Sequence, residues 1–360
     1  MRQLNTSSNT WLIYALGGGF GHLNRAIALV GRIASRHRHV KILINTPYFP
    51  YIEKFLPETN CEFFAISPTA DFETTCTEVQ KILRDTDYQC LIVDTFPRGL
   101  GGELAAILTE LKISWRVLIH RDINYEYVKV KKLHRFVADC FDLVLVPGEG
   151  FEVAMANLPC VEHTNPWLIR SAWELPVRED VESILRLNLF ERNSKILLIL
   201  ASGMAEELSF YGELTSILSQ CLTNVVVRCL SVEKPDNCPE SLWVFHWPAM
   251  ECLQVADVVV GGGGYNTIYE CQALGVPLVA FAWQRLYDRQ RLRVHLASAS
   301  YEAGLAQSPV VLVNCLESAI AAVGNLLNLP VSKCCRPGYD FVNGALSAVS
   351  AIELCCNFTN

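Results

Sequence analysis

Residues 256–293 read ADVVVGGGGYNTIYECQALGVPLVAFAWQRLYDRQRLR, and they are the most informative part of the chain. Here an apolar strand, Val258 to Val260, runs into four glycines, a helix-like segment follows, and a second apolar strand ends at Phe281. At such a turn the backbone N–H groups can approach an anion, and the helix dipole favours negative charge. Glu270 lies in the helix-like segment, where its carboxylate can accept hydrogen bonds from a sugar diol. The stretch therefore predicts a pocket for a nucleotide-linked sugar.

The same alternation of short apolar runs and amphipathic segments continues along the rest of the chain. Strands are expected at residues 11–16, 40–45, 90–93, 115–119 and 143–146, and again at 195–200, 224–229, 242–245, 258–260, 277–281 and 310–313. Such alternation is typical of parallel sheets with crossover helices. Because 360 residues exceed one ordinary core, the sequence predicts an α/β protein of two doubly wound, Rossmann-like domains that face each other across a cleft.

The boundary between these domains is expected near Pro166. The residue before a proline favours extended backbone, which suits a hinge, and a polar stretch follows as far as Asn193. We therefore assign residues 1–166 to the first domain and residues 167–360 to the second.

The composition excludes several classes of protein. Apolar residues make up 51% and charged residues 19% of the chain, which is typical of a globular protein rather than a disordered one. The net charge of −7 argues against a nucleic-acid partner, because proteins that bind nucleic acids are usually basic. The 15 cysteines include no Cys-x-x-Cys pair, so we expect reduced thiols in a cytoplasmic protein and no bound metal.

Membrane insertion is not expected from this sequence. It starts with a polar segment, MRQLNTSSNT, and contains no apolar run of the ~20 residues that cross a bilayer. A basic amphipathic stretch at residues 129–135 could contact anionic lipid, although an exposed helix face is the favoured explanation. Peripheral contact with the inner face of the membrane therefore stays open.

A second glycine turn, GGGFGH at residues 17–22, joins the first expected strand to a helix. It lacks the Gly-Lys-Ser/Thr ending of a phosphate P-loop, and its spacing departs from the G-x-G-x-x-G of dinucleotide-binding turns. His22 opens the helix, where the dipole disfavours the charged imidazolium and keeps the ring able to accept a proton. We therefore favour His22 as a general base over a simple helix cap.

Two further polar residues follow buried strands. Asp94 ends the strand CLIVD, and His120 follows residues 115–119. The carboxyl ends of strands in α/β sheets border the ligand crevice, so Asp94 could orient His22, act as the base itself, or only cap a turn. His120 could face the same crevice. The sequence alone leaves both questions open.

Together these motifs resemble the GT-B glycosyltransferases and, within them, family 28, which includes the N-acetylglucosaminyltransferase of peptidoglycan lipid intermediates. The likeness covers nearly the whole chain and is most specific in the C-terminal block. The matching elements there are Asp257, Gly263-Gly264, Thr267, Glu270, Ala273-x-Gly275-x-Pro277, Gln284 and Asp288-Arg289-Gln290. Those in the remainder are Gly17, Gly18, Gly21 and His22, with Ala201-Ser202-Gly203 and the hinge Thr164-Asn165-Pro166.

The resemblance implies an N-terminal domain that binds the acceptor and a C-terminal domain that binds a nucleotide-sugar donor. Glu270 would hold the ribose hydroxyls of that donor. The other donor-binding residues would be Gly263, Gly264 and Thr267 at the pyrophosphate, Ser202 and Gly203 at the phosphate cavity, and Gln284, Asp288 and Gln290 at the sugar. The acceptor-side loop would comprise Gly18, Gly19, Gly21 and His120. GT-B enzymes generally work without a bound metal, so no cofactor is implied beyond the UDP-sugar co-substrate.

The expected activity is that of an inverting hexosyltransferase, in which His22, assisted by Asp94, takes the proton of an acceptor hydroxyl. The run GHLNR at residues 21–25 lacks the acceptor-side pattern of the peptidoglycan enzyme and is similar to the Gly-His-x-x-Arg form of UDP-sugar hydrolases of nonulosonate synthesis. The acceptor therefore stays open, a lipid-linked one included. A UDP-sugar hydrolase or epimerase on the same fold, and a non-catalytic nucleotide-sugar-binding subunit, remain alternatives.

Overall fold

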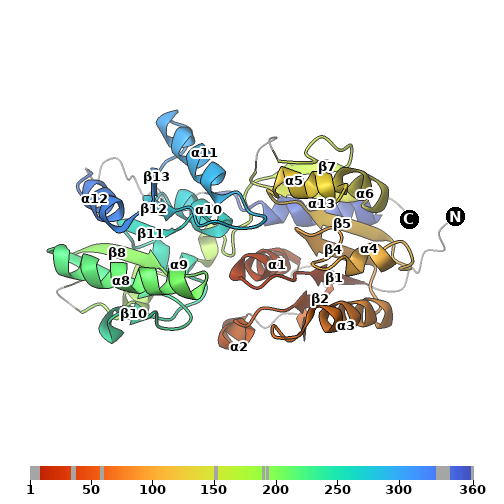
Figure 1. Cartoon of the computed structure of the whole chain (residues 1–360), viewed down its shortest axis with the longest axis horizontal. Coiled ribbons are helices and arrows are strands. Elements are labelled where there is room, and N and C mark those ends of the chain that lie inside the picture. Colours follow the sequence, from red (N-terminus) through yellow and green to blue (C-terminus); the bar gives the residue numbers. More distant parts are fainter. Residues whose placement is uncertain are drawn as a thin grey trace. The chain divides into compact units, whose positions relative to one another are not determined.

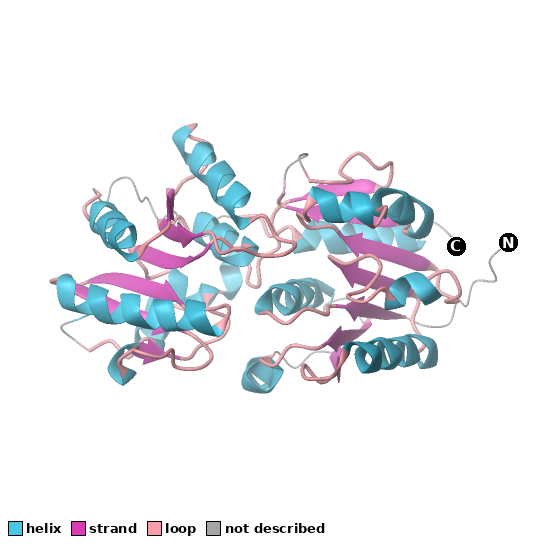
Figure 2. Cartoon of the chain, viewed as in Figure 1, coloured by secondary structure: helices cyan, strands magenta, loops and turns pink. Residues whose placement is uncertain are grey.

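The computed structural model describes residues 9–33, 38–56, 61–149, 153–188, 191, 194–329 and 341–357. The chain divides into two compact units. Unit 1 is formed by Met1–Ile169 together with Val342–Asn360, and unit 2 is formed by Arg170–Phe341. Each unit is built on one parallel sheet that is flanked by helices (Figure 1, Figure 2).

The sheet of unit 1 has the strand order β3-β2-β1-β4-β5-β6-β7, and neighbouring strands run parallel. Its strands are β1 (Thr10–Tyr14), β2 (His39–Ile44), β3 (Cys61–Ala65), β4 (Cys90–Asp94), β5 (Trp115–Ile119), β6 (Leu143–Pro147) and β7 (Val161–Thr164). Its helices are α1 (Phe20–Ile33), α2 (Phe49–Ile52), α3 (Phe72–Asp85), α4 (Glu103–Ile107), α5 (Tyr125–Val130), α6 (Leu133–Cys140) and α13 (Ala345–Asn357), with a 3-10 turn at Glu53–Phe55.

The sheet of unit 2 has the order β10-β9-β8-β11-β12-β13 and is likewise parallel. Its strands are β8 (Lys195–Leu200), β9 (Val225–Leu230), β10 (Trp243–Val244), β11 (Val258–Gly262), β12 (Leu278–Phe281) and β13 (Val310–Val313). Its helices are α7 (Arg178–Ile184), α8 (Ala205–Cys221), α9 (Met250–Leu253), α10 (Tyr265–Ala273), α11 (Gln290–Glu302) and α12 (Leu316–Leu327), with 3-10 turns at Ala172–Glu174 and Glu240–Leu242.

The order of the strands gives each unit one topological switch point. In unit 1 the chain runs from β1 through β2 to β3, and then continues on the other side of β1 from β4 to β7. In unit 2 it runs from β8 through β9 to β10, and then from β11 to β13 on the other side of β8. The loops after β1 and β4, and those after β8 and β11, therefore diverge from each other. In doubly wound sheets ligands bind in the crevice that such diverging loops leave.

The central strands are apolar because helices cover both of their faces. All five residues of β4, CLIVD, are buried, and β8 is buried from its second residue onward. The predicted doubly wound α/β architecture is confirmed, whereas the edge strands β3 and β7 of unit 1 were not predicted. Two residues of each edge strand are exposed, so neither presents the continuous apolar run by which the central strands are identified.

The last described helix corrects the expected division of the chain at residue 166. Residues 167–360 were assigned to the second domain, but α13 packs against α1 and beside β5, β6 and β7 of unit 1 (Figure 1). The Asn343 side chain fixes this return, because its Nδ2 donates to the Leu168 carbonyl at 2.7 Å and its Oδ1 accepts from the Leu168 N–H at 3.2 Å. The apolar face of α13 contains no strand pattern and no motif that indicates its partner. The sequence therefore did not show which unit the helix completes.

Candidate functional site

The switch point of unit 1 brings His22 and Asp94 together. His22 lies in the first turn of α1, which follows β1, and Asp94 is the last residue of the neighbouring strand β4. His22 Nδ1 lies 2.8 Å from Asp94 Oδ2. The His22 side chain is 17% exposed and that of Asp94 is 1% exposed, so the imidazole lies between the buried carboxylate and the surface.

Arg25, one turn further along α1, completes this cluster. Its Nε donates to Asp94 Oδ1 at 3.1 Å and its Nη2 donates to Asp94 Oδ2 at 2.7 Å. Thr95 donates its hydroxyl to Asp94 Oδ1 at 3.0 Å, although φ of 68° is rare for a β-branched residue. Burial by itself would raise the pKa of Asp94, but the Arg25 guanidinium and then His22 outweigh it and hold that pKa below its usual range.

The ionised Asp94 determines which nitrogen of His22 is available. A carboxylate only accepts hydrogen bonds, so Nδ1 carries the proton of the neutral ring and Nε2 carries the lone pair. Gly17 leaves room for this edge of the ring, because a Cβ at residue 17 would lie 2.4 Å from His22 Nε2. A neutral imidazole held in this tautomer can take a proton through Nε2.

The other glycines of the first turn differ in their surroundings. Gly18 and Gly19 are exposed, and a Cβ at either position would meet no atom within 4 Å. A Cβ at Gly21 would lie 3.5 Å from Arg25 Nη1. The structure thus leaves open space beside Gly18 and Gly19, next to His22.

His120 was expected on the acceptor-side loop, but the structure gives its side chain no exposed surface. Its Nε2 hydrogen-bonds to the Ala154 carbonyl, and its Nδ1 is enclosed with no partner in the described residues. Burial lowers the pKa of His120 to about 4. The expected position is therefore corrected: the ring is enclosed inside unit 1, where the Ala154 carbonyl holds it, rather than at an open edge.

Arg121 and Asp122 follow His120 and are also buried. Their common partner is Glu149, which comes after β6. Arg121 Nη2 lies 3.2 Å from Glu149 Oε1, and the Asp122 N–H donates to Glu149 Oε2 at 2.5 Å. This network joins the ends of β5 and β6, and it gives Arg121 an ion-pair partner other than its sequence neighbour Asp122.

The switch point of unit 2 lies between the Ser202-Gly203 turn after β8 and the Gly263-Gly264 turn after β11. Ser202 and Gly203 are exposed. A Cβ at Gly263 would lie 2.6 Å from Val294 Cγ2, so Gly263 allows α11 to pack against the turn. Gly264 has open space around it, with no atom within 4 Å of a Cβ.

The helices that follow these two turns differ in their charge. The first turn of α8 contains Glu206 and Glu207, whereas the first turn of α10 contains no acidic residue. The N-cap of α10 is Gly264, which provides no side-chain cap, and Thr267 lies in the first turn. The N–H groups at the start of α10 are therefore the ones suited to an anion, because no carboxylate opposes it there.

Glu270 lies one turn into α10 and is 6% exposed. Burial raises its pKa to about 8. Within the part of the chain that the structure describes, its carboxylate has no hydrogen-bond partner, yet neither oxygen is among the fully enclosed unpaired polar atoms. A buried carboxylate without donors is costly unless a ligand supplies them.

The segment after β12 holds the remaining predicted donor residues. Gln284 is exposed. Asp288 accepts from Arg293 Nη2 at 2.6 Å, and the buried Gln290 accepts from the Trp283 N–H at 3.1 Å. Arg293 also reaches the Gly263 carbonyl at 3.4 Å. The sequence did not single out Arg293, which ties this segment to the glycine turn after β11.

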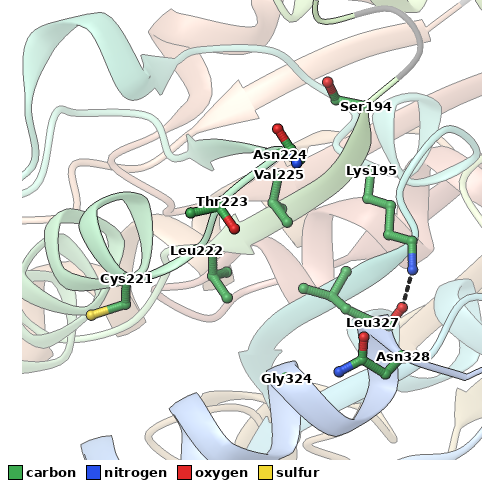
Figure 3. A pocket seen from close by; sticks show the side chains of 10 residues that line it. All are labelled: Ser194, Lys195, Cys221, Leu222, Thr223, Asn224, Val225, Gly324, Leu327 and Asn328. Carbon is green, nitrogen blue, oxygen red and sulfur yellow. Dashed lines mark hydrogen bonds between the residues drawn. The ribbon is translucent and has the colours of Figure 1, made fainter.

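A pocket of about 630 Å³ lies in unit 2 at the amino ends of the strands, opposite to the end that carries the glycine turns (Figure 3). It is lined by the first residues of β8 and β9, the end of α8 and the end of α12. Lys195 lies on its wall and donates through Nζ to the Leu327 carbonyl at the end of α12. Strand amino ends form this pocket, so it is separate from the glycine turns at the strand carboxyl ends.

The described ranges contain no group of three or more His, Cys, Asp or Glu side chains arranged to hold a metal ion. None of the helices in these ranges combines the length and the apolar character that a membrane span requires. The cysteines with described surroundings are free thiols.

The two parallel sheets, each with its switch point, form the GT-B fold, and solved structures of that fold match nearly the whole chain. A glycotransferase of kitacinnamycin matches with a TM-score of 0.63 and 15% identity, over 97% of this chain and 99% of its own. The calicheamicin glycosyltransferase CalG4 matches with a TM-score of 0.56 and 17% identity, over 97% and 98%. The UDP-GlcNAc 2-epimerase from Methanocaldococcus jannaschii matches with a TM-score of 0.58 and 12% identity, over 96% and 99%.

No family model matches the chain, and no curated protein matches it in sequence. The structural likeness establishes the fold, which transferases and an epimerase share. Fold alone does not separate these activities, because activity depends on the particular residues at the two switch points.

Proposed function

We propose that this protein is a glycosyltransferase that moves a hexose from a UDP-sugar to an acceptor hydroxyl with inversion at the anomeric carbon. The observation that carries the proposal is the His22–Asp94 pair, 2.8 Å apart at the switch point of unit 1, with Nε2 of His22 available. Such a pair is a general base with a fixed tautomer. The open space at Gly18 and Gly19 is where the acceptor hydroxyl would approach.

The donor would bind unit 2. Glu270 would accept hydrogen bonds from the two ribose hydroxyls, because its buried carboxylate has no partner of its own in the described residues. The diphosphate would lie at the start of α10, beside Gly264 and Thr267, where no carboxylate opposes it. Gln284, Asp288 and Gln290 would contact the sugar, and Ser202 and Gly203 would border the phosphates.

The reaction would be a single displacement. As the acceptor oxygen attacks the anomeric carbon, its proton passes to Nε2 of His22, and Asp94 stabilises the imidazolium that forms. The bond from the anomeric carbon to the diphosphate oxygen breaks, and its electron pair leaves with UDP. Because attack occurs opposite to the leaving group, the anomeric configuration inverts. The backbone donors of α10 would stabilise the charge on UDP.

The test is incubation of the purified protein with UDP-, dTDP- and GDP-sugars, with and without a panel of acceptors that includes lipid extracts and small hydrophobic alcohols. Release of nucleotide that depends on an acceptor, together with a new glycoside of inverted configuration, supports the proposal. Nucleotide binding with no turnover on any acceptor would instead indicate a non-catalytic subunit.

A UDP-sugar hydrolase or epimerase is the second candidate. Two observations favour it: the match to an epimerase over 96% of the chain, and the Gly-His-x-x-Arg run that contains His22 and Arg25. In a hydrolase, water would take the place of the acceptor beside His22. Release of UDP and free sugar at the same rate with and without acceptors would identify a hydrolase, and an altered UDP-sugar would identify an epimerase.

A further inference from the structure

An ion pair connects the first turn of α8 with the loop after β12 in unit 2. Arg285, after β12, donates through Nη1 and Nη2 to the two carboxylate oxygens of Glu207, both at 2.5 Å. Glu207 lies in the first turn of α8, after β8, and is 8% exposed, whereas Arg285 is 25% exposed. The strand between β8 and β12 is β11, so the pair spans the end of the strand that leads to α10.

The surrounding loops are shaped to accommodate this pair. Gly203 has φ of +127°, and a Cβ there would lie 1.8 Å from Glu207 Oε2 and 3.2 Å from Arg285 Nη2. Only glycine therefore allows the carboxylate and the guanidinium to lie over the turn after β8. Trp283 Nε1 donates to the Tyr211 hydroxyl at 2.8 Å and holds the same two segments together.

The segment that carries Arg285 contacts the end of β11, beside the proposed binding site of the diphosphate. Trp283, two residues before Arg285, makes this contact. A Cβ at Gly262 would lie 3.7 Å from Trp283 Cδ1 and 3.8 Å from the Tyr211 hydroxyl. Gly262 is the last residue of β11, and Gly264 follows as the N-cap of α10. The segment that carries Arg285 is thus packed at the turn where an anion would bind.

The guanidinium keeps unused donors. Arginine has five N–H groups, and three of them bond to Glu207 and to the Gln284 carbonyl, the latter at 3.1 Å. Two N–H groups remain with no partner in the described residues. A guanidinium fixed on one side by a carboxylate, with donors free on another, is preorganised to bind a phosphate.

The negative charge in the first turn of α8 explains why an arginine is favourable at residue 285. Glu206 and Glu207 stand in the first turn of α8, next to the turn at which the sequence predicts phosphate binding. Unpaired carboxylates there would repel a diphosphate. Arg285 neutralises Glu207 and can also stabilise the charge that develops on a leaving diphosphate.

We propose that Arg285 is a ligand of the donor diphosphate and that Glu207 and Gly203 hold its guanidinium in place. The inference rests on the proposed function, because it assumes that unit 2 binds a nucleoside diphosphate. It adds a charged side chain to the backbone donors of α10 and makes Glu207 a positioning residue.

The test is calorimetric titration of the full-length protein and its variants with UDP and with uridine; the dTDP–thymidine and GDP–guanosine pairs are run in parallel. R285Q is expected to weaken UDP binding about 10- to 100-fold and to change uridine binding less than twofold, because one charge-assisted phosphate contact is lost. R285K keeps the positive charge but lacks the planar guanidinium with its several N–H donors, so it should bind UDP with an intermediate affinity. R291Q, at an exposed arginine of α11, is the matched control and should bind like the wild type.

A second variant separates phosphate contact from a general role in folding. G203A should displace the Glu207–Arg285 pair and weaken UDP binding selectively, as R285Q does, while thermal unfolding shows that the protein remains folded. UDP binding by folded R285Q at the wild-type affinity, or an equal loss for uridine and UDP, would overturn the inference while leaving the proposed function intact. A wild-type protein that binds none of the three nucleoside diphosphates would overturn both.

Discussion

In unit 1 the buried acid at the switch point between β1 and β4, Asp94, is paired with its neighbours, whereas in unit 2 the buried acid on the helix after β11, Glu270, has no partner in the described residues. The contrast is clearest for two buried acids. Asp94 is held by Arg25 and His22, and its pKa lies below the usual range. Glu270 has no partner in the described residues, and burial raises its pKa to about 8. Burial is common to both, so the neighbouring cation determines the direction of the shift.

This contrast also separates two roles. A carboxylate that stays ionised can fix the tautomer of a histidine, as a proton acceptor requires. A buried carboxyl group with no partner in the described residues gains hydrogen bonds when a ligand with hydroxyl groups binds. The same doubly wound framework can therefore support proton transfer in one unit and ligand binding in the other, through a few residues after the strands.

The largest expected effect concerns the paired site. H22A and D94N should each lower kcat about 10²- to 10⁴-fold, because the proton acceptor or its orienting partner is removed. The affinity for UDP should not change, since both residues lie in unit 1. Steady-state kinetics and UDP titration measure the two quantities, and H134A, at an exposed histidine of α6, is the control. Full turnover by H22A would remove the base from the mechanism.

Removing the cation of the paired site should destabilise the protein. R25M leaves the buried Asp94 without its guanidinium and should lower the free energy of unfolding by about 3–5 kcal/mol, as measured by urea denaturation. R135M removes an arginine that is 89% exposed and pairs with Asp139 at 3.5 Å, so it should cost less than about 1 kcal/mol. R25M/D94N should recover part of the loss. Equal effects of R25M and R135M would contradict the contrast between buried and exposed pairs.

Substitution of the unpaired acid, Glu270, should raise the free energy of unfolding instead of lowering it. The folded-state pKa of Glu270, about 8, lies above the ordinary 4.5. The unfolded chain therefore ionises first, and the free energy of unfolding falls as the pH rises between these values. E270Q should therefore be more stable than the wild type by about 1–3 kcal/mol near pH 8, and the difference should shrink towards pH 5. E270Q should also bind UDP more weakly. A destabilised E270Q near pH 8 would mean that the carboxylate has a structural partner.

The smallest effect is a proton released on binding. Ribose hydroxyls that donate to Glu270 stabilise its ionised form, so donor binding should lower its pKa and release up to about one proton near pH 7. The affinity should accordingly rise with pH between about 6 and 8, by at most about tenfold per pH unit. Titration with UDP-glucose in buffers of different ionisation enthalpy measures the release. E270Q should release no proton, and equal release by E270Q and the wild type would show that Glu270 is not the source of the proton.

The sequence predicted the parts of the fold that are buried on both faces. Continuous apolar runs identified β1, β4 and β8, whereas the half-exposed edge strands β3 and β7 and the place of α13 depend on tertiary packing. Their local sequences carry no comparable signal.

For the candidate site, the glycine turns and His22 could be located because strand, turn and helix are contiguous in the sequence. The place of Arg25 beside His22 could also be predicted, since it lies three residues after His22 on one helix. The Glu207–Arg285 pair could not be predicted, because its members are 78 residues apart and only the adjacency of β8, β11 and β12 brings them together. Asp94 ends β4 and His120 follows β5, so their places in the sequence are similar, and the enclosure of His120 depends on tertiary packing.

The return of α13 to unit 1 has a consequence for the order in which the protein is made. Unit 2 is one uninterrupted stretch, Arg170–Phe341, and all of it is synthesised before α13. Unit 1 begins first but cannot cover the side of α1 that contacts α13 until that helix has been synthesised. Domains usually complete their folding from the N-terminus onward during synthesis. Here the whole of unit 2 is synthesised before the helix that completes unit 1, and a nascent chain released before α13 would expose the surface of α1 to aggregation.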